Sequence, residues 1–130
     1  MVPESLSGQE EKNVALKLSS REVDGVTVLA LDGRIVLGEE TNSLREKVKG
    51  LLAEGKRKLV LDMSNVTLID SAGLGTLVGV HHSANTSGAS LRLCNLGAKF
   101  RELLQMTRLL TVFEVSANEA EAVRSLSKGA

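Results

Sequence analysis

The chain has 130 residues, of which 42% are hydrophobic, 25% charged and only 2% aromatic, and its 16 basic residues balance its 16 acidic ones. This length fits one domain with a single core. Because there is no basic excess, and Phe100 and Phe113 stand without any Trp or Tyr, the composition argues against a nucleic-acid-binding protein, which needs clustered positive charge and stacking surfaces.

Cysteine content and the N-terminal sequence favour a cytoplasmic protein. Cys94 is the only cysteine, and its place in the apolar run 91–94 predicts a buried small side chain rather than a reactive thiol. The first residues contain no apolar run typical of a signal peptide, and no stretch approaches the ~20 apolar residues of a membrane span. We therefore expect a reducing compartment and no direct insertion into a membrane.

The first half of the chain predicts a tail, a hairpin and a helix. Residues 1–12 have the composition of a disordered tail, which leaves 13–130 as a single domain. Asp24-Gly25 separates two apolar segments and tolerates the positive φ of a tight hairpin turn. Apolar residues at helical spacing follow and end near Gly55. A capping box of Ser43 with Glu46 could start this helix, or Thr41 or Asn42 could cap it instead.

The second half alternates strands and helices. We expect a strand within 56–63, a linking stretch over 64–70, a helix over about 71–87 and a strand over 90–94. A helix with Phe100, Leu103 and Leu104 facing inward comes next, then a short strand near 111–115. Ser116 with Glu119 would cap a last helix with Val123 and Leu126 in the core. This order predicts an α/β fold, with a mixed sheet that opens in an antiparallel hairpin, continues in βαβ units and carries about four helices.

The stretch 67–75 is the most unusual connection, since it places an acid, a hydroxyl and glycines at the start of a helix, where functional residues of open α/β sheets tend to lie. Gly73, Gly75 and Gly79 each cost that helix up to ~1 kcal/mol relative to alanine, so we expect a neighbouring element or a partner to approach closely. Ser71 is either an ordinary N-cap or a serine whose phosphate would meet the helix N–H groups and the positive end of the dipole.

Catalytic interpretations of this stretch are weak. A nucleophile elbow needs glycine where Ile69 stands. His81 would lie roughly 15 Å from Ser71 along a continuous helix, too far to act as its base. His81 and its neighbour His82 point in different directions and are poorly placed to share a metal. The glycine spacing matches a dinucleotide fingerprint only loosely, and no Walker lysine follows. We expect no catalytic residue, metal or cofactor.

The sequence Ile69-Asp70-Ser71-Ala72-Gly73-Leu74-Gly75 resembles the STAS domain, in particular the bacterial anti-sigma factor antagonists. The similarity extends to the segments 59–62, 88–95, 101–107 and 112–113. It therefore covers nearly the whole chain, from about Val14 to Ser127.

This resemblance implies a switch protein that is not an enzyme and is a monomer or weak dimer. In the family, the unphosphorylated antagonist binds an anti-sigma factor, often a serine kinase, and releases the sigma factor. The kinase phosphorylates the serine after the motif aspartate, which corresponds to Ser71, and a serine phosphatase removes the phosphate. The resemblance places the partner-binding surface at Asp70, Ser71, Ala72, Gly73, Leu74 and Gly75.

This sequence departs from the family at two positions. Ala72 stands where many relatives carry a second hydroxyl. Relatives also often have an aspartate after the second strand, where this chain has valine, and Glu39 and Glu40 are candidate substitutes in partner binding.

A second function class is a STAS subunit of a transport complex, such as a lipid-transport ATPase, which would share the fold and differ in its partner. The intact pair Asp70-Ser71 favours the switch, because a scaffold needs no phosphate acceptor. An enzyme or nucleotide-binding protein is disfavoured by the lack of a base near Ser71.

Overall fold

Asp24 and Gly25 form the turn of the first hairpin. A computed structural model describes residues 16–128, so the predicted tail at 1–12 and the first residues of the predicted domain lie outside the described residues. Strand β1 (Leu16–Val23) pairs antiparallel with β2 (Val26–Ile35), and Asp24 and Gly25 have φ of 52° and 79°. The predicted hairpin is confirmed, because these residue types accept the positive φ of a two-residue turn.

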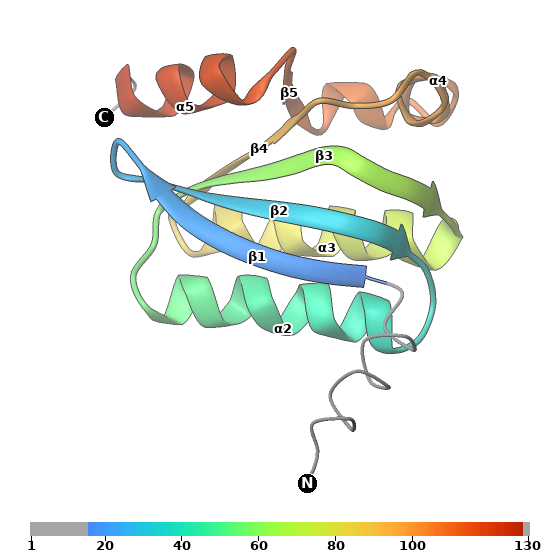
Figure 1. The fold of residues 1–130 in the computed structure, drawn as a ribbon, viewed down its shortest axis with the longest axis horizontal. Coiled ribbons are helices and arrows are strands. Elements are labelled where there is room, and N and C mark those ends of the chain that lie inside the picture. Colours follow the sequence, from blue (N-terminus) through green and yellow to red (C-terminus); the bar gives the residue numbers. More distant parts are fainter. Residues whose placement is uncertain (1–15, 129–130) are drawn as a thin grey trace, which may run out of the picture.

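Along the described residues, helices and strands then alternate as predicted, with one short 3₁₀ helix added. They are α2 (Glu39–Ala53), β3 (Lys58–Ile69), α3 (Ser71–Thr86), β4 (Ser90–Cys94), α4 (Ala98–Met106), η1 (Leu109–Thr111), β5 (Glu114–Ser116) and α5 (Glu119–Lys128). The strands form one sheet in the order β1-β2-β3-β4-β5, in which only the β1–β2 pair is antiparallel. Helices α2 and α3 cover one face of the sheet and α5 covers the other (Figure 1). The mixed α/β sheet is thus confirmed.

The centre of the sheet is buried on both faces. Leu59 and Leu61 belong to the apolar cluster under α2 and α3, whereas Val60 belongs to the cluster under α5. This two-sided burial explains the continuous apolar run at 59–61.

Cys94 is fully buried in the same cluster as Val60, and burial raises the pKa of its thiol to about 12, so the thiol stays protonated at neutral pH. The predicted structural role of Cys94 is confirmed.

Strand β3 is longer than predicted. The prediction of a linking stretch over 64–70 is wrong, because the strand continues to Ile69, which pairs with Ile35 of β2. Val66, Leu68 and Ile69 are apolar but are interrupted by polar residues, so this part of the strand lacks the continuous apolar run of 59–61. Pairing with β2 forms it instead, with two register shifts at which β3 carries an extra residue.

Helix α2 starts earlier than predicted. Its N-cap position is Gly38, whose φ of 123° favours glycine, and no side chain caps the helix. Glu39 and Glu40 occupy the first turn, where negative charge suits the helix dipole. This arrangement overturns all the predicted caps, namely Thr41, Asn42 and the Ser43–Glu46 pair.

The last strand and helix are displaced from their predicted positions. Ser116 belongs to β5, where it pairs with Cys94, and therefore does not cap α5. The cap is Asn118, whose Oδ1 accepts a hydrogen bond from the Glu121 N–H at 2.9 Å. The predicted pairing of Ser116 with Glu119 is wrong. The strand predicted near 111–115 begins only at Glu114, because Thr111 is the last residue of η1.

Other predicted features are confirmed. Gly55 and Gly88, with φ of 91° and 77°, follow the ends of α2 and α3. Of the side chains expected to face inward from α4 and α5, Leu104, Val123 and Leu126 are buried in the two clusters and Phe100 packs against one of them. Leu103 is half-buried.

Candidate functional site

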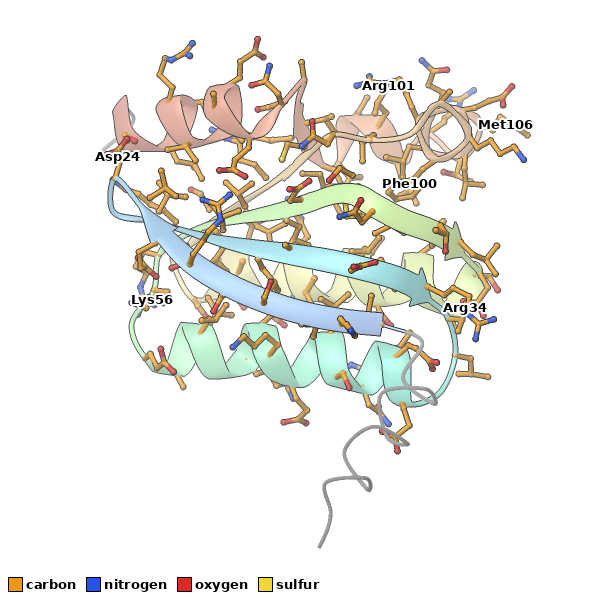
Figure 2. The ribbon with its side chains drawn as sticks, viewed as in Figure 1. Asp24, Arg34, Lys56, Phe100, Arg101 and Met106 are labelled. Carbon is orange, nitrogen blue, oxygen red and sulfur yellow. The ribbon has the colours of Figure 1, made fainter. Side chains whose placement is uncertain are left out.

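The carboxyl ends of β2 and β3 bring two helix starts together. Ile35 and Ile69 are paired at the ends of these neighbouring parallel strands, and α2 and α3 begin shortly after each. The connection 36–38 and the residues Asp70 and Ser71 therefore lie at the same end of the sheet, where Arg34 also lies (Figure 2). This is the edge at which ligands and partners commonly bind in α/β sheets.

Asp70 joins the two connections. It is the N-cap of α3: its Oδ1 accepts a hydrogen bond from the Gly73 N–H at 2.7 Å. Its Oδ2 accepts a second from the Leu37 N–H at 3.1 Å, and its own N–H donates to the Ile35 carbonyl at 3.3 Å. Both carboxylate oxygens are thus used to fix backbone geometry.

These hydrogen bonds also favour the charged form of Asp70. The N–H groups of Leu37 and then Gly73 hold the pKa of this carboxyl below its ordinary value, against a smaller opposing effect of burial. At neutral pH Asp70 is an anion that is already engaged with the backbone, which suits a positioning role better than that of a general base.

Ser71 is the first residue of α3 and is exposed. The N-cap interpretation of Ser71 is wrong, because Asp70 occupies the N-cap position. The first-turn N–H groups of a helix lie near this position and carry its partial positive charge. Ala72 and Leu74, the neighbours of Ser71 in the predicted partner surface, are half-buried.

The glycines of α3 fall into two kinds. Gly73 is buried, and a Cβ built on it would lie 1.9 Å from the Ile35 carbonyl oxygen, so this glycine permits the close approach of β2. Gly75 and Gly79 are exposed, and a Cβ on either would meet nothing within 4 Å. The predicted close approach by a neighbouring element is confirmed only at Gly73.

Ser71, Gly75 and Gly79 are spaced four residues apart on one continuous helix and are all exposed. At this spacing they lie on one face of α3. Along this line of α3, no side chain therefore projects for about two turns beyond the serine.

Glu39 and Glu40 lie close to this site along the chain. They form the first turn of α2, two and three residues after Leu37, whose N–H is bound by Asp70. Glu39 is exposed and Glu40 is half-buried. The structure thus brings the residues predicted from the resemblance to one end of the sheet, with acidic side chains at both helix starts.

His81 lies on the same continuous helix as Ser71, in its third turn, and packs its ring edge-on against Phe113 at 5.4 Å between ring centroids. Partial burial and the neighbouring His82 lower the pKa of His81. His82 is exposed. His81 therefore has a packing role against Phe113.

Leu37 is the site residue that sequence reasoning missed. Its side chain is 76% exposed, while its N–H is fixed by Asp70. The sequence feature that could have identified Leu37 is Val36-Leu37-Gly38, in which two apolar residues stand in a turn after the end of a strand.

The chain is thus an α/β domain that presents an exposed serine at the capped start of a helix. The STAS domain family model matches residues 17–122, and the chain belongs to this family. The BtrV protein of Bordetella bronchiseptica, whose name describes it as an anti-sigma factor antagonist, is 30% identical over 115 residues, which cover 88% of this chain and 97% of BtrV.

Solved structures share the fold. A Thermotoga maritima protein described as an anti-sigma factor antagonist is 25% identical, with a TM-score of 0.72 over 83% of this chain and 92% of that one. The phosphorylated form of SpoIIAA from Bacillus has a TM-score of 0.65 at 18% identity, over 86% of this chain and 99% of SpoIIAA.

A transporter also contains this fold. The murine anion transporter Slc26a9 matches 97% of this chain with a TM-score of 0.73, at 16% identity, but the match covers only 24% of the transporter. This likeness shows the fold alone. Within residues 16–128, no helix has the length and apolar character needed to cross a membrane.

Proposed function

We propose that this protein is an anti-sigma factor antagonist, and that phosphorylation of Ser71 switches it off. The observation that carries the proposal is the division of roles at the start of α3. Asp70 takes the capping role, which leaves Ser71 exposed in the first turn and accessible to a kinase. The likeness to BtrV over nearly its whole length supports the same function.

The partner surface would comprise the start of α3 and the connection that Asp70 holds beside it. Ser71, Ala72, Leu74, Gly75 and the Asp70 backbone would contact the anti-sigma factor, with Glu39 and Glu40 at the margin, while Gly73 shapes this surface from beneath. The exposed stripe of Gly75 and Gly79 would let a partner element approach the helix backbone closely, which explains why the helix tolerates two poor helix formers.

Phosphorylation would act through charge at this surface. A phosphoserine carries about −1.5 to −2 charge at neutral pH. In the free protein, water and the start of α3 accommodate that charge. Against a partner, the same charge would lose water without a matching cation, at a cost of several kcal/mol. The anti-sigma factor would itself be the serine kinase, and a separate serine phosphatase would restore binding.

The remaining parts of the proposal follow from this role. The protein would act in the cytoplasm, as a monomer or weak dimer, by binding rather than by catalysis and without a cofactor. A STAS subunit of a transport complex is the alternative, but it gives no reason for an exposed serine beside an aspartate whose two carboxylate oxygens both bind backbone N–H groups.

A pull-down with identification of partners by mass spectrometry tests the proposal. Unphosphorylated wild-type protein should recover an anti-sigma factor, and Ser71→Asp should not. Ser20→Asp, at an exposed serine of β1, is the matched control for added charge and should behave as wild type. Recovery of transport ATPase or permease subunits by all three proteins would favour the alternative.

A further inference from the structure

Strands β3 and β4 differ greatly in length, and this leaves part of β3 without a neighbour. β4 pairs with β3 only from Lys58–Ser90 to Asp62–Cys94, whereas β3 continues to Ile69. Among the described residues, no strand pairs with β3 on this side from Met63 onward. The backbone N–H and C=O groups of a strand point to its two sides in turn. Along about 20 Å of β3, the groups that point away from β2 therefore have no partner strand.

The chain turns away at the point where this edge begins. Asn95 follows β4 with a φ of 60°, and its Nδ2 donates a hydrogen bond to Asp62 Oδ1 at 3.0 Å. This contact ends the β3–β4 pairing and directs the chain into α4, which lies at the same end of the molecule as the end of β3 (Figure 1). The edge of β3 therefore faces a helix rather than a strand.

A groove of about 460 Å³ separates the open edge from α4. Val66, Leu68 and Ile69 line it from β3, and Phe100 and Leu103 line it from α4. Leu68 is 51% exposed, and Phe100 is labelled beside the exposed Met106 and Arg101 in Figure 2. A volume in this range is typical of sites that bind ligands.

We propose that this groove binds an extended segment of the anti-sigma factor, which adds as a short strand to the open edge of β3. This inference rests on the proposed function and names a second contact for that partner. The Ser64 N–H already donates to Asp62 Oδ1 at 3.0 Å. Backbone groups of Asn65–Ile69 would therefore supply the main-chain hydrogen bonds, and the apolar walls would accept alternate side chains of the segment. A lipid chain would fill the apolar walls but would leave the backbone groups unpaired.

The charge of the groove and its position next to Ser71 predict the composition of the bound segment. Lys99 is the only charged residue that lines the groove, and the first turn of α4 contains no acidic side chain. The segment should therefore carry apolar residues and at least one acidic residue near Lys99. Leu68 and Ile69 lead directly into Asp70 and Ser71, so one partner can reach the groove and the phosphorylation site together.

Two variants of the full chain test the groove against the anti-sigma factor recovered in the pull-down and then purified. Leu68→Glu removes an exposed apolar side chain and places an acid opposite Arg34, its partner in the β2–β3 register, so the fold should tolerate it. Val112→Glu, at a residue that is 40% exposed beside η1, is the matched control. Calorimetric titration should show at least a tenfold weaker Kd for Leu68→Glu and an unchanged Kd for Val112→Glu.

Amide hydrogen exchange of the wild-type protein gives a readout that does not depend on a variant's folding. Amides within Val66–Ile69 that exchange quickly in the free protein should become protected in the complex. If the wild type binds the factor while Leu68→Glu binds equally well and these amides are unprotected, the groove proposal is overturned and the proposed function stands.

Other outcomes overturn the proposal in different ways. If the unphosphorylated wild type recovers no anti-sigma factor, both the proposed function and the groove proposal fail. If sedimentation shows a wild-type dimer that Leu68→Glu abolishes, a second copy of the chain occupies the edge. A lipid that co-purifies with the wild type but not with Leu68→Glu would assign the groove to that lipid.

Discussion

The carboxylate of Asp70 accepts a hydrogen bond from the Leu37 N–H at 3.1 Å and thereby ties the β2–α2 connection to the start of α3. The other carboxylate oxygen caps α3 through the Gly73 N–H. One side chain thus sets the relative position of the exposed Leu37 and the exposed Ser71, although 33 residues separate Asp70 from Leu37 in the chain.

Replacement of Asp70 by asparagine should change how stability depends on pH. Asparagine caps a helix about as well as aspartate but does not ionise. The pKa of Asp70 is held below its ordinary value of 3.8 in the folded protein, so its charge stabilises the fold above that value and the contribution is lost as pH falls through the lower folded pKa. Urea unfolding of wild type and Asp70→Asn should show a difference that is constant near neutral pH and shrinks below about pH 4. A difference that does not change between pH 7 and pH 3 would contradict this assignment.

Alanine at Gly73 and at Gly75 should have opposite effects on stability. The added Cβ at Gly73 meets the Ile35 carbonyl, so Gly73→Ala should destabilise the fold by about 1–3 kcal/mol despite its better helix propensity. Gly75→Ala meets nothing and should stabilise the free protein by up to ~1 kcal/mol. Urea unfolding measures the change in unfolding free energy for both variants. Equal changes would show that the contact of Gly73 with β2 does not make the two positions different.

Ser71 should be the only functional phosphate acceptor. Ser71 is exposed at the start of α3, and Ala72 provides no second hydroxyl beside it. Incubation with the cognate kinase and ATP should add one phosphate, detected by intact mass, and Ser71→Ala should abolish it. Stoichiometric labelling of Ser71→Ala would refute the assignment.

Phosphorylation should block the partner locally and leave the domain intact. At an exposed helix start the dipole offsets part of the charge, by roughly 0.3–1 kcal/mol, and the Asp70 carboxylate opposes it by a smaller, salt-screened amount. In a complex that excludes water, a loss of ~3 kcal/mol would weaken affinity more than a hundredfold. Amide NMR spectra of the two forms should differ mainly near Ser71, with binding measured in parallel. Shifts across the whole sheet, or unchanged affinity at full phosphorylation, would exclude a local block.

The purified protein should show no ester or nucleotide hydrolysis that depends on Ser71. His81 packs against Phe113 nearly three turns beyond Ser71, and the Asp70 carboxylate is engaged with backbone N–H groups. Assays of wild type and Ser71→Ala with activated esters and nucleoside triphosphates check this expectation. Turnover that survives purification and disappears in Ser71→Ala would overturn the binding role.

Local patterns in the sequence were sufficient for most of the fold. Asp24-Gly25 specifies its turn through the φ values that these residue types accept, and the apolar run at 59–61 marks a strand buried on both faces. The Asp70–Gly75 motif also located the candidate site, because its residue types meet at a helix start. Such features depend on neighbours in the chain, and the sequence displays them directly.

Tertiary contacts decided what these patterns left open. The second half of β3 is a strand because β2 pairs with it, and the second carboxylate oxygen of Asp70 reaches Leu37, 33 residues away in the chain. The exposed apolar side chain of Leu37 and the open edge after Met63 likewise depend on where distant segments stop. Such features arise from hydrogen bonds and packing between residues far apart in the chain, which no local periodicity or capping pattern encodes.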